Sequence, residues 1–320
     1  MIAAITVTYN SSQLLEKNVQ ALLRQSVPVE GIVIVDNHST PEHQEKIRSL
    51  AALDARIQVL WLPENTGGAG GFSHGMAYVR EQWDPDWYWL MDDDAYPADD
   101  CLEKLLDHRN QVEDVGCLAP MIFGIDRQEY QLYHHKKLSR LLIRDIPAVD
   151  SREDMPETLP IEADAFVGPL FSRQAVDAVG IADGSLFIYG DDLEYTYRVS
   201  RHFPVLLVRD AVIYHRDPLK QQDESNPGGW WKDYYMFRNR IFFIKKYQEH
   251  LLLQAAGQLA MVWEIGKRCL GALVKEKFRG NRKLRLWLML RALQDGWTGK
   301  TGKTIDPASY FQFLEKREKR

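Results

Sequence analysis

The sequence predicts an α/β fold, with a mostly parallel central sheet between layers of helices, followed by a C-terminal helical region. β-branched apolar runs of strand length alternate with helical periodicity from residue 2 to residue 92. Each of these apolar runs ends in polar residues, and ligands of such sheets bind at the strand ends. From about residue 230 the strand signals give way to helical periodicity. We therefore predict an α/β domain at 1–229 and a helical, basic region at 230–320.

The predicted elements follow one another along the chain. Strands are expected at 2–8, 31–35, 57–61 and 87–91, and helices at 14–23, at 41–53 and after the glycines of 67–71. Farther along, we expect a central strand at 164–171, a short helix at 173–179, a helix that begins at Asp191 and a strand from 205 to 215. The polar stretch 216–229 predicts a mobile loop before the helices, and a charged tail is expected after about residue 295.

Composition excludes several classes of site. The chain has 320 residues, of which 45% are hydrophobic and 27% charged, as is typical of a globular protein. Cys101, Cys117 and Cys269 are scattered without CxxC spacing, which argues against a disulfide framework and against a zinc site. The net charge of −5 hides an asymmetry, because residues 245–320 carry 17 Lys or Arg against 7 Asp or Glu. Nucleic acid and anionic lipid are both candidate partners for this basic segment.

Three consecutive aspartates, Asp92, Asp93 and Asp94, directly follow the apolar run 87–91. Carboxylates gathered at the end of a buried strand repel one another and raise one another's pKa unless a cation holds them. Oxygen ligands of this kind suit Mg²⁺ or Mn²⁺. The alternative is a solvated acidic turn without a ligand.

Polar residues also end the neighbouring predicted strands, at Thr8-Tyr9-Asn10, at Asp36-Asn37 and at Glu64-Asn65. The carboxyl ends of parallel strands meet at one edge of the sheet, so a nucleotide-type crevice is expected there. Four glycines within 67–71 lead into a helix, which lets the backbone approach a ligand closely. A simple turn is the alternative for this glycine-rich segment.

A second acid pair, Asp191 and Asp192, begins a predicted helix, where the helix dipole favours ionised carboxylates. Two carboxylate pairs could indicate a glycoside hydrolase, but a triple aspartate beside a glycine-rich loop fits phosphate and metal better. The pair His134-His135 has no acid nearby in the sequence and is expected at the surface. The run 296–304 resembles a phosphate loop but has the wrong spacing and follows a basic helix, so we interpret it as a linker.

The order of the motifs TVTYN, IVDN, NTGGAGGF, DDD, YGDDLEYTYR and YH resembles the family-two glycosyltransferases, which have a GT-A fold. The resemblance covers residues 1 to about 245. NTGGAGGF together with the triple aspartate is most similar to bacterial galactofuranosyltransferases, with rhamnosyltransferases close behind. The resemblance implies a nucleotide-sugar donor, a divalent cation (Mn²⁺ or Mg²⁺) and transfer with inversion.

The resemblance also implies roles for the acids. Asp92 and Asp94 would hold the metal and the donor with Asp93 beside them, and His215, after an apolar strand, would complete the metal site. Asp192 would be the general base that takes the proton of the acceptor hydroxyl, and Asp191 would orient the site, although the two could exchange roles. The alternatives are a helix N-cap for Asp191, a solvated first turn for Asp192 and a structural histidine at a strand end for His215.

Contacts with the two substrates are implied in the same way. The donor-binding residues would be those at the strand ends and in the glycine-rich segment, namely Thr8, Asn10, Asp36, Asn37, Asn65, Gly67, Gly68, Asp92 and Asp93. The aromatic start of the C-terminal helices suits the apolar faces of sugars, so we predict an acceptor-binding wall at Trp230, Trp231, Tyr234 and Arg238. The alternative is that these four side chains pack the helix onto the rest of the protein.

The C-terminal quarter contains two apolar stretches of different character. The stretch 251–263 is interrupted by Gln254 and Gln258 and is too short to span a bilayer. Basic residues interleaved with leucines at 267–290 predict a cationic amphipathic helix at an anionic membrane surface. The alternative is a helix pair that packs on the catalytic domain or on a second subunit of a homo-oligomer.

These observations together predict an inverting, metal-dependent glycosyltransferase that builds a bacterial surface polysaccharide such as O-antigen. The expected donor is UDP-galactofuranose, the expected acceptor a lipid-linked glycan, and the expected location the cytoplasmic face of the cell membrane. The alternative within the class is a rhamnosyltransferase that uses dTDP-rhamnose. Alternatives of other classes are a nucleotidyltransferase and a non-catalytic, membrane-bound scaffold. Nucleic acid is not expected as a partner, because it would leave the acidic constellation without a role.

Overall fold

The computed structural model describes residues 1–139, 143–216 and 226–318. Most of the loop predicted at 216–229 lies outside the described residues. The chain forms two compact units, which we describe separately. The first comprises the described residues of Met1–Leu138, Asp145–Gly184 and Asp191–Asp217, and the second those of Ser139–Arg144, Ser185–Gly190 and Pro218–Arg320.

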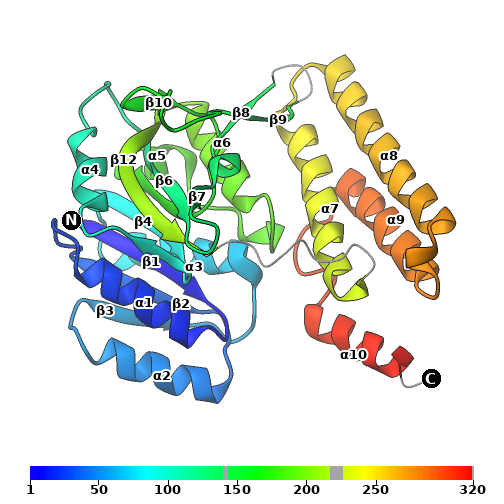
Figure 1. Ribbon diagram of the computed structural model, residues 1–320, viewed down its shortest axis with the longest axis horizontal. Helices are drawn as coiled ribbons and strands as arrows, with labels where there is room; N and C mark the ends of the chain where they lie inside the picture. The colour runs from blue at the N-terminus through cyan, green and yellow to red at the C-terminus, as the bar shows by residue number, and fades with distance from the viewer. Residues whose placement is uncertain (140–142, 217–225, 319–320) are drawn as a thin grey trace. The chain divides into compact units, whose positions relative to one another are not determined.

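The first unit is built on a ten-stranded sheet (Figure 1). The strand order is β10-β12-β6-β11-β4-β1-β2-β3, with β5 paired to β12 and β7 paired to β6. The strands are β1 (Ile2–Thr8), β2 (Gly31–Asp36), β3 (Ile57–Trp61), β4 (Trp87–Asp92), β5 (Ala95–Pro97), β6 (Cys117–Gly124), β7 (Glu129–Tyr130), β10 (Thr158–Pro160), β11 (Val167–Ser172) and β12 (Val205–His215). Two further strands, β8 (Lys136–Leu138) and β9 (Asp145–Pro147), form a separate antiparallel pair.

Helices cover both faces of this sheet, which is why β1 and β2 are buried along their whole length. One apolar core joins the sheet to α1 (Ser12–Leu23), α2 (Pro41–Ala51) and α4 (Cys101–Asp107). The other joins it to α3 (Gly67–Gln82), α5 (Arg173–Val179) and α6 (Asp191–Ser200). The neighbours β4, β1, β2 and β3 run parallel, as predicted, whereas β11 is antiparallel to both β4 and β6. The predicted fold class, an α/β sandwich followed by helices, is confirmed.

Strand β12 carries an irregularity that matters for the site at its end. It runs parallel to β6, with Val208 opposite Pro120 and Val212 opposite Met121, so residues 209–211 form a bulge. Beyond the bulge, β12 also pairs antiparallel with β5, which places Tyr214 opposite Tyr96 and His215 opposite Ala95. Successive side chains of a strand point to opposite faces, so Tyr214 and His215 point to opposite sides of this strand.

The glycine-rich segment lies inside α3, which begins at Gly67 and not after the glycines. Gly67 has a positive φ of 74°, which favours glycine at this helix start. A Cβ atom on Gly71 would lie 2.5 Å from Val7 Cγ1, so α3 rests directly on β1. By contrast, no described residue lies within 4 Å of a Cβ atom placed on Gly68. The glycines therefore serve close helix–sheet packing at Gly71 and leave open space at Gly68.

The second unit is helical and has its own apolar core. Its helices are α7 (Trp230–Tyr247), α8 (Leu251–Val274), α9 (Arg282–Thr298) and α10 (Pro307–Glu318). The sequence did not predict α10, which occupies the expected charged tail. Among the described helices, none combines the length and apolar character needed to cross a bilayer.

The structure corrects the prediction that the stretch 267–290 forms an exposed amphipathic helix. This stretch contains the end of α8 and the first half of α9, and α9 buries Leu284, Leu288 and Met289 in the core of the second unit. Arg285 is also buried, and its guanidinium contacts the carboxylate of Asp233 on α7 at 2.5 Å. Basic residues interleaved with leucines were therefore a sign of a helix packed within the unit.

Candidate active site

Asp92, Asp94 and His215 come together at the ends of β4 and β12. Each residue offers one ligand atom, and these atoms all lie within 4.8 Å of one another. His215 Nε2 lies 3.3 Å from Asp94 Oδ1, because the pairing of β5 with β12 places His215 opposite Ala95. His215 is remote in the sequence from the two aspartates, and the sheet brings all three residues to one edge.

Gln131, which the sequence analysis missed, holds the other side of the His215 ring. His215 Nδ1 lies 3.0 Å from Gln131 Oε1, and Gln131 is buried. The amide oxygen accepts the Nδ1–H proton, so the Nε2 lone pair is directed toward Asp94. Ligand histidines are commonly oriented by such a partner on the second nitrogen. Gln131 lies 84 residues from His215, and no motif surrounds it.

The triple aspartate is electrostatically strained without a cation. Burial, and then the neighbouring carboxylates of Asp94 and Asp93, raise the pKa of Asp92 well above its ordinary value. Burial raises the pKa of Asp93 to about 7, although the Thr8 hydroxyl donates to Asp93 Oδ2 at 2.6 Å and opposes the shift. Two carboxylates with one imidazole are a donor set that suits Mn²⁺, which accepts both oxygen and nitrogen ligands. These residues therefore fit a divalent cation.

Asp191 and Asp192 begin α6, as predicted, and lie within electrostatic reach of the triple aspartate. Their charges contribute to the raised pKa of Asp92. Burial and the Asp192 charge raise the pKa of Asp191 itself to about 8. Burial also raises the pKa of Asp192, whose Oδ1 accepts the backbone N–H of Leu193 at 2.7 Å. Both side chains are thus held in a site that disfavours charge, unlike the acids of a solvated helix turn.

The expectation that His134-His135 lies at the surface was wrong. His135 is fully buried, and its Nδ1 lies 3.0 Å from Oδ1 of the buried Asp164. Burial lowers the pKa of the half-buried His134 to about 3. Asp164 also raises the pKa of Asp192, so the buried pair lies within electrostatic reach of the second acid cluster. The pair joins residues 29 positions apart, which explains why the sequence showed no acid beside the histidines.

The residues predicted for donor binding lie at the ends of β1, β2 and β4 and at the start of α3, and several of them already hold loop backbone. Asp36 accepts the N–H of Ser39 at 3.2 Å, and Asn10 Oδ1 accepts the N–H of Thr40 at 2.8 Å. Asn37 joins β2 to the start of α3, since its Oδ1 accepts from Thr66 N at 2.8 Å and its amide donates to the Gly67 carbonyl at 2.9 Å. Asn65 Oδ1 accepts the N–H of Gly67 at 2.8 Å. These contacts shape the rim of the site.

The acceptor-binding wall predicted at Trp230, Trp231, Tyr234 and Arg238 is not supported, because the second unit buries all four side chains. Trp230 packs under the Arg285 guanidinium, and the Tyr234 hydroxyl donates to Asp295 Oδ2 at 2.7 Å. Arg238 donates to the carbonyls of Leu186 and Gly302. These contacts lie within the second unit, so the four side chains belong to the packing of α7 inside that unit.

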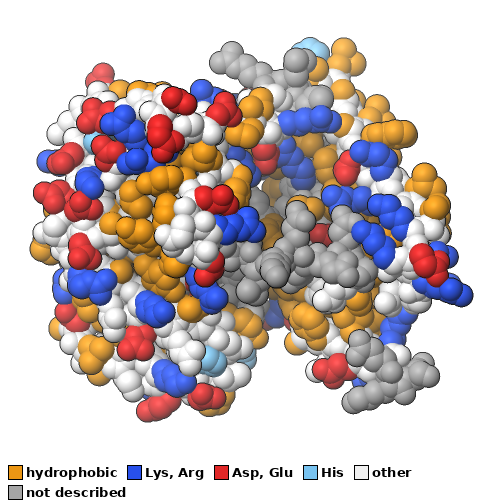
Figure 2. All heavy atoms as spheres, viewed as in Figure 1, with side chains coloured by type: hydrophobic (Ala, Val, Ile, Leu, Met, Phe, Trp, Pro, Cys, Tyr) orange, Lys and Arg blue, Asp and Glu red, His pale blue; other side chains and the backbone are white. Residues whose placement is uncertain are grey.

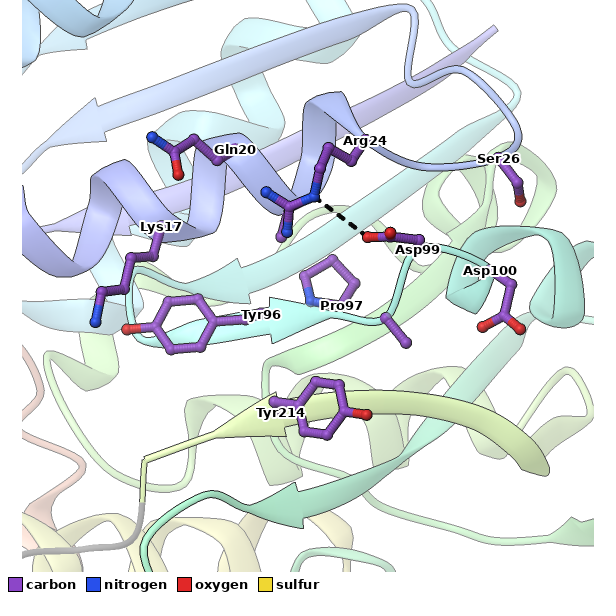
Figure 3. Close-up of a pocket in the computed structure, with 11 residues that line it drawn as sticks. Lys17, Gln20, Arg24, Ser26, Tyr96, Pro97, Asp99, Asp100 and Tyr214 are labelled. Atoms are coloured by element: carbon purple, nitrogen blue, oxygen red, sulfur yellow. Dashed lines mark hydrogen bonds and ion pairs between the residues drawn. The ribbon is translucent and has the colours of Figure 1, made fainter.

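A separate groove of about 670 Å³ lies between α1 and the β5–β12 pair (Figure 3). Tyr96 and Tyr214 line it together with Lys17, and Arg24 and Asp99 form an ion pair at 3.4 Å beside it. Because Tyr214 and His215 point to opposite sides of β12, this groove does not contain the cluster of Asp92, Asp94 and His215.

Comparisons with known proteins agree with this geometry. The model of Glycosyl transferase family 2 matches residues 3–180. Galactofuranosyltransferase GlfT1 of Mycolicibacterium smegmatis is 30% identical over 257 residues, which cover 77% of this chain and 83% of that relative. GlfT1 of Mycobacterium tuberculosis H37Rv is 29% identical over 259 residues, with 77% and 82% covered.

Solved structures show the same fold. GalNAc-T7, solved with UDP, GalNAc and Mn²⁺, superposes with a TM-score of 0.61 at 13% identity, covering 94% of this chain and 56% of that one. A mannosyltransferase of Pyrobaculum calidifontis, solved with GDP-Man and Mn²⁺, gives a TM-score of 0.56 at 14% identity, with 93% and 87% covered. The GT-A fold implied by the motifs is confirmed.

Proposed function

Since this chain belongs to glycosyl transferase family 2, we propose that it transfers galactofuranose from UDP-galactofuranose to a growing bacterial surface glycan. The chain is a glycosyltransferase, and the choice of sugar is supported by the galactofuranosyltransferases that are 29–30% identical to it over 77% of its length. The runner-up is a rhamnosyltransferase that uses dTDP-rhamnose. Family membership leaves the nucleotidyltransferase and the non-catalytic scaffold without support.

One observation carries the mechanism: Asp92, Asp94 and His215 converge within electrostatic reach of Asp191 and Asp192. Asp92, Asp94 and His215 would hold a divalent cation, Mn²⁺ or Mg²⁺, which when bound neutralises the charge that develops on the departing nucleoside diphosphate. The raised pKa of Asp192 makes it a stronger base than an exposed aspartate. Its carboxylate takes the acceptor hydroxyl proton as the new glycosidic bond forms with inversion.

The rim residues position the donor. Asn37, Asn65 and Asp36 accept backbone N–H groups at the start of α3 and after β2, and they thereby fix the shape of the rim that would receive the nucleotide. At Gly68 an added Cβ atom would point into open space, and this space would let the donor approach the backbone. Catalysis is assigned to the α/β domain at 1–229 and membrane contact to the helical region at 230–320. The acceptor would be lipid-linked, at the cytoplasmic face of the cell membrane.

The donor is tested by transfer assays of the purified protein with Mn²⁺, offering UDP-galactofuranose and dTDP-rhamnose separately to a galactan-type acceptor. Turnover with the UDP sugar alone supports the proposal. Turnover with dTDP-rhamnose alone moves the assignment to the runner-up. A melting-temperature shift with Mn²⁺ and UDP, absent with dTDP, is the binding counterpart of the same test.

A further inference from the structure

Helix α8 carries a long apolar strip that no described residue of the second unit covers. Leu252 is 76% exposed, Leu259 66%, Trp263 70% and Leu270 61%. At 100° per residue these side chains fall on one side of the helix. The same side carries no charged residue, and it consists of Leu251, Leu252, Ala255, Ala256, Leu259, Val262, Trp263, Gly266, Leu270, Leu273 and Val274. We name these residues the α8 strip.

The strip is large compared with ordinary exposed apolar patches. A helix of 24 residues is about 36 Å long, and the strip runs from its first to its last residue. Figure 2 shows hydrophobic side chains along the outer edge of α8, with Lys and Arg side chains beside them. Continuous apolar patches of this extent mark surfaces that bind another protein or a membrane.

The opposite side of α8 is anchored within the second unit. Ile265 and Ala272 are buried, and the Gln254 amide donates to the carbonyl of Lys245 at the end of α7. The Arg268 guanidinium lies over the Phe237 ring of α7. Since these contacts fix which side of α8 faces α7, the strip faces away from the core.

A cationic pocket borders the strip. It has a volume of about 460 Å³ and lies between α7 and α8, where Arg144, Arg240 and Lys267 line it. Trp263 belongs to both the pocket and the strip. The pocket lining also includes one acid, Glu264, which pairs with Lys267 at 2.6 Å, so three basic side chains and one acidic side chain line the pocket. Three cations beside an aromatic residue are suited to a phosphate group on an apolar surface.

We propose that the α8 strip inserts into the headgroup boundary of an anionic bilayer and that Arg144, Arg240 and Lys267 bind the phosphate of an anionic glycerophospholipid there. The inference deepens the proposed membrane partnership, on which it rests. It places that partnership on α8, where the sequence analysis had placed it on 267–290. A one-sided apolar helix bordered by cations, with a tryptophan at the border, is typical of helices that lie in a membrane interface.

Charge also decides against a second copy of this chain as the occupant. Lys267, Arg268 and Lys275 border the strip with a single acid among them, Glu264. Two such surfaces brought together would place cations against cations, which repel across a desolvated contact. Anionic lipid headgroups meet the same border with opposite charge.

The test is flotation of the full chain with phosphatidylcholine vesicles, with and without phosphatidylglycerol. The strip variant is Leu259→Glu with Trp263→Glu, and its matched control is Leu53→Glu, which changes an equally exposed leucine of the first unit. The pocket variant is Arg144→Gln with Lys267→Gln, and its control is Lys46→Gln with Arg48→Gln, which removes two exposed charges of α2. Circular dichroism and transfer to a water-soluble acceptor show that each variant is folded.

The wild-type chain and both controls should float with phosphatidylglycerol vesicles. The strip variant should stay in solution. The pocket variant should bind the vesicles about 30-fold more weakly, because each of the two lost cations contributes about fivefold to the affinity. Trp263 fluorescence should shift to the blue on binding, and Trp263→Phe should remove that shift.

Flotation of the strip variant equal to that of wild type would overturn the inference. The inference would also be overturned if light scattering showed that the wild-type chain is an oligomer and the strip variant a monomer, because a second copy of the chain would then cover the strip. Absence of vesicle binding with intact transfer to a soluble acceptor rejects the docking surface and leaves the proposed function standing. Vesicle binding that follows the strip, without transfer from any donor, rejects the proposed function alone.

Discussion

The His215 imidazole donates its Nδ1–H to Gln131 Oε1 at 3.0 Å and presents Nε2 to Asp94 Oδ1 at 3.3 Å. The buried amide therefore fixes both the tautomer and the ring orientation of a candidate metal ligand. A neutral residue remote in the sequence thus controls how the acids of β4 and the histidine of β12 act together.

Replacing Gln131 by alanine should weaken Mn²⁺ binding about 10- to 100-fold, because the His215 ring loses the partner that orients it. Calorimetric titration with Mn²⁺ measures this effect. Saturating Mn²⁺ should restore most of the turnover, since the ligands themselves remain. Gln128→Ala, at an exposed position whose amide donates to the nearby Ile125 carbonyl, is the control and should bind Mn²⁺ as wild type does. Unchanged Mn²⁺ affinity in Gln131→Ala would remove His215 from the metal site.

Asp192→Asn should lower kcat by about 10²- to 10⁴-fold while KM for the donor and Mn²⁺ affinity change little. Asparagine keeps the shape of the side chain and an oxygen that can accept the Leu193 N–H, but it cannot take a proton. Steady-state kinetics of Asp192→Asn and Asp191→Asn, measured side by side, identify the base. A larger loss in Asp191→Asn, with turnover retained in Asp192→Asn, would exchange the two roles.

The metal-free protein should melt at a higher temperature near pH 6 than near pH 9. Asp93 and Asp191 have folded-state pKa values of about 7 and about 8, above the value of roughly 4 in an unfolded chain. Between pH 6 and 9 the folded state therefore binds more protons than the unfolded state, and its stability falls as pH rises through these values.

Thermal melts at both pH values, with and without Mn²⁺, check this expectation. Mn²⁺ should reduce the difference, because the positive charge of the bound cation would favour the ionised forms of Asp93 and Asp191 and lower their pKa values. Asp191→Asn should reduce it in the metal-free protein, because one of the titrating groups is removed. Melting temperatures that are equal at the two pH values would mean that these acids are solvated in solution.

Gly71→Ala should destabilise the protein by about 1–3 kcal/mol, because the added methyl group would meet Val7 Cγ1 at 2.5 Å and push α3 away from β1. Gly68→Ala is the matched control, since the added methyl group has no neighbour within 4 Å among the residues that the structure describes. That variant should gain up to about 1 kcal/mol from helix propensity yet bind the donor more weakly. Urea unfolding and the KM for the donor separate the two effects. Equal stability of both variants would contradict the close contact of α3 with β1.

Local sequence patterns predicted most of the first unit, because the hydrophobic periodicity of each strand and helix there is visible within a few residues. The apolar run before Asp92 and the helix after Asp191 follow from periodicity and from the acids that end or begin them. Gln131 and the His135–Asp164 pair could not be found in this way, since each acts on a partner that only the folded sheet brings near. The burial of Trp230 and the exposure of Trp263 were equally hidden, because periodicity shows that a helix has an apolar side without showing what covers it.

The bulge at residues 209–211 of β12 determines which side of the strand each later residue faces, because successive side chains alternate between the two sides. With three residues in the bulge, His215 turns toward the acids and Tyr214 toward the groove on the other side. An insertion of one residue into this bulge, with the pairing of the strand end kept, would bring Tyr214 opposite Ala95 and place a phenol where the imidazole now stands, with no side chain of the site itself replaced. The number of residues in the bulge thus decides which side chain faces the acids. An insertion there would have the same effect on the site as a substitution at position 215.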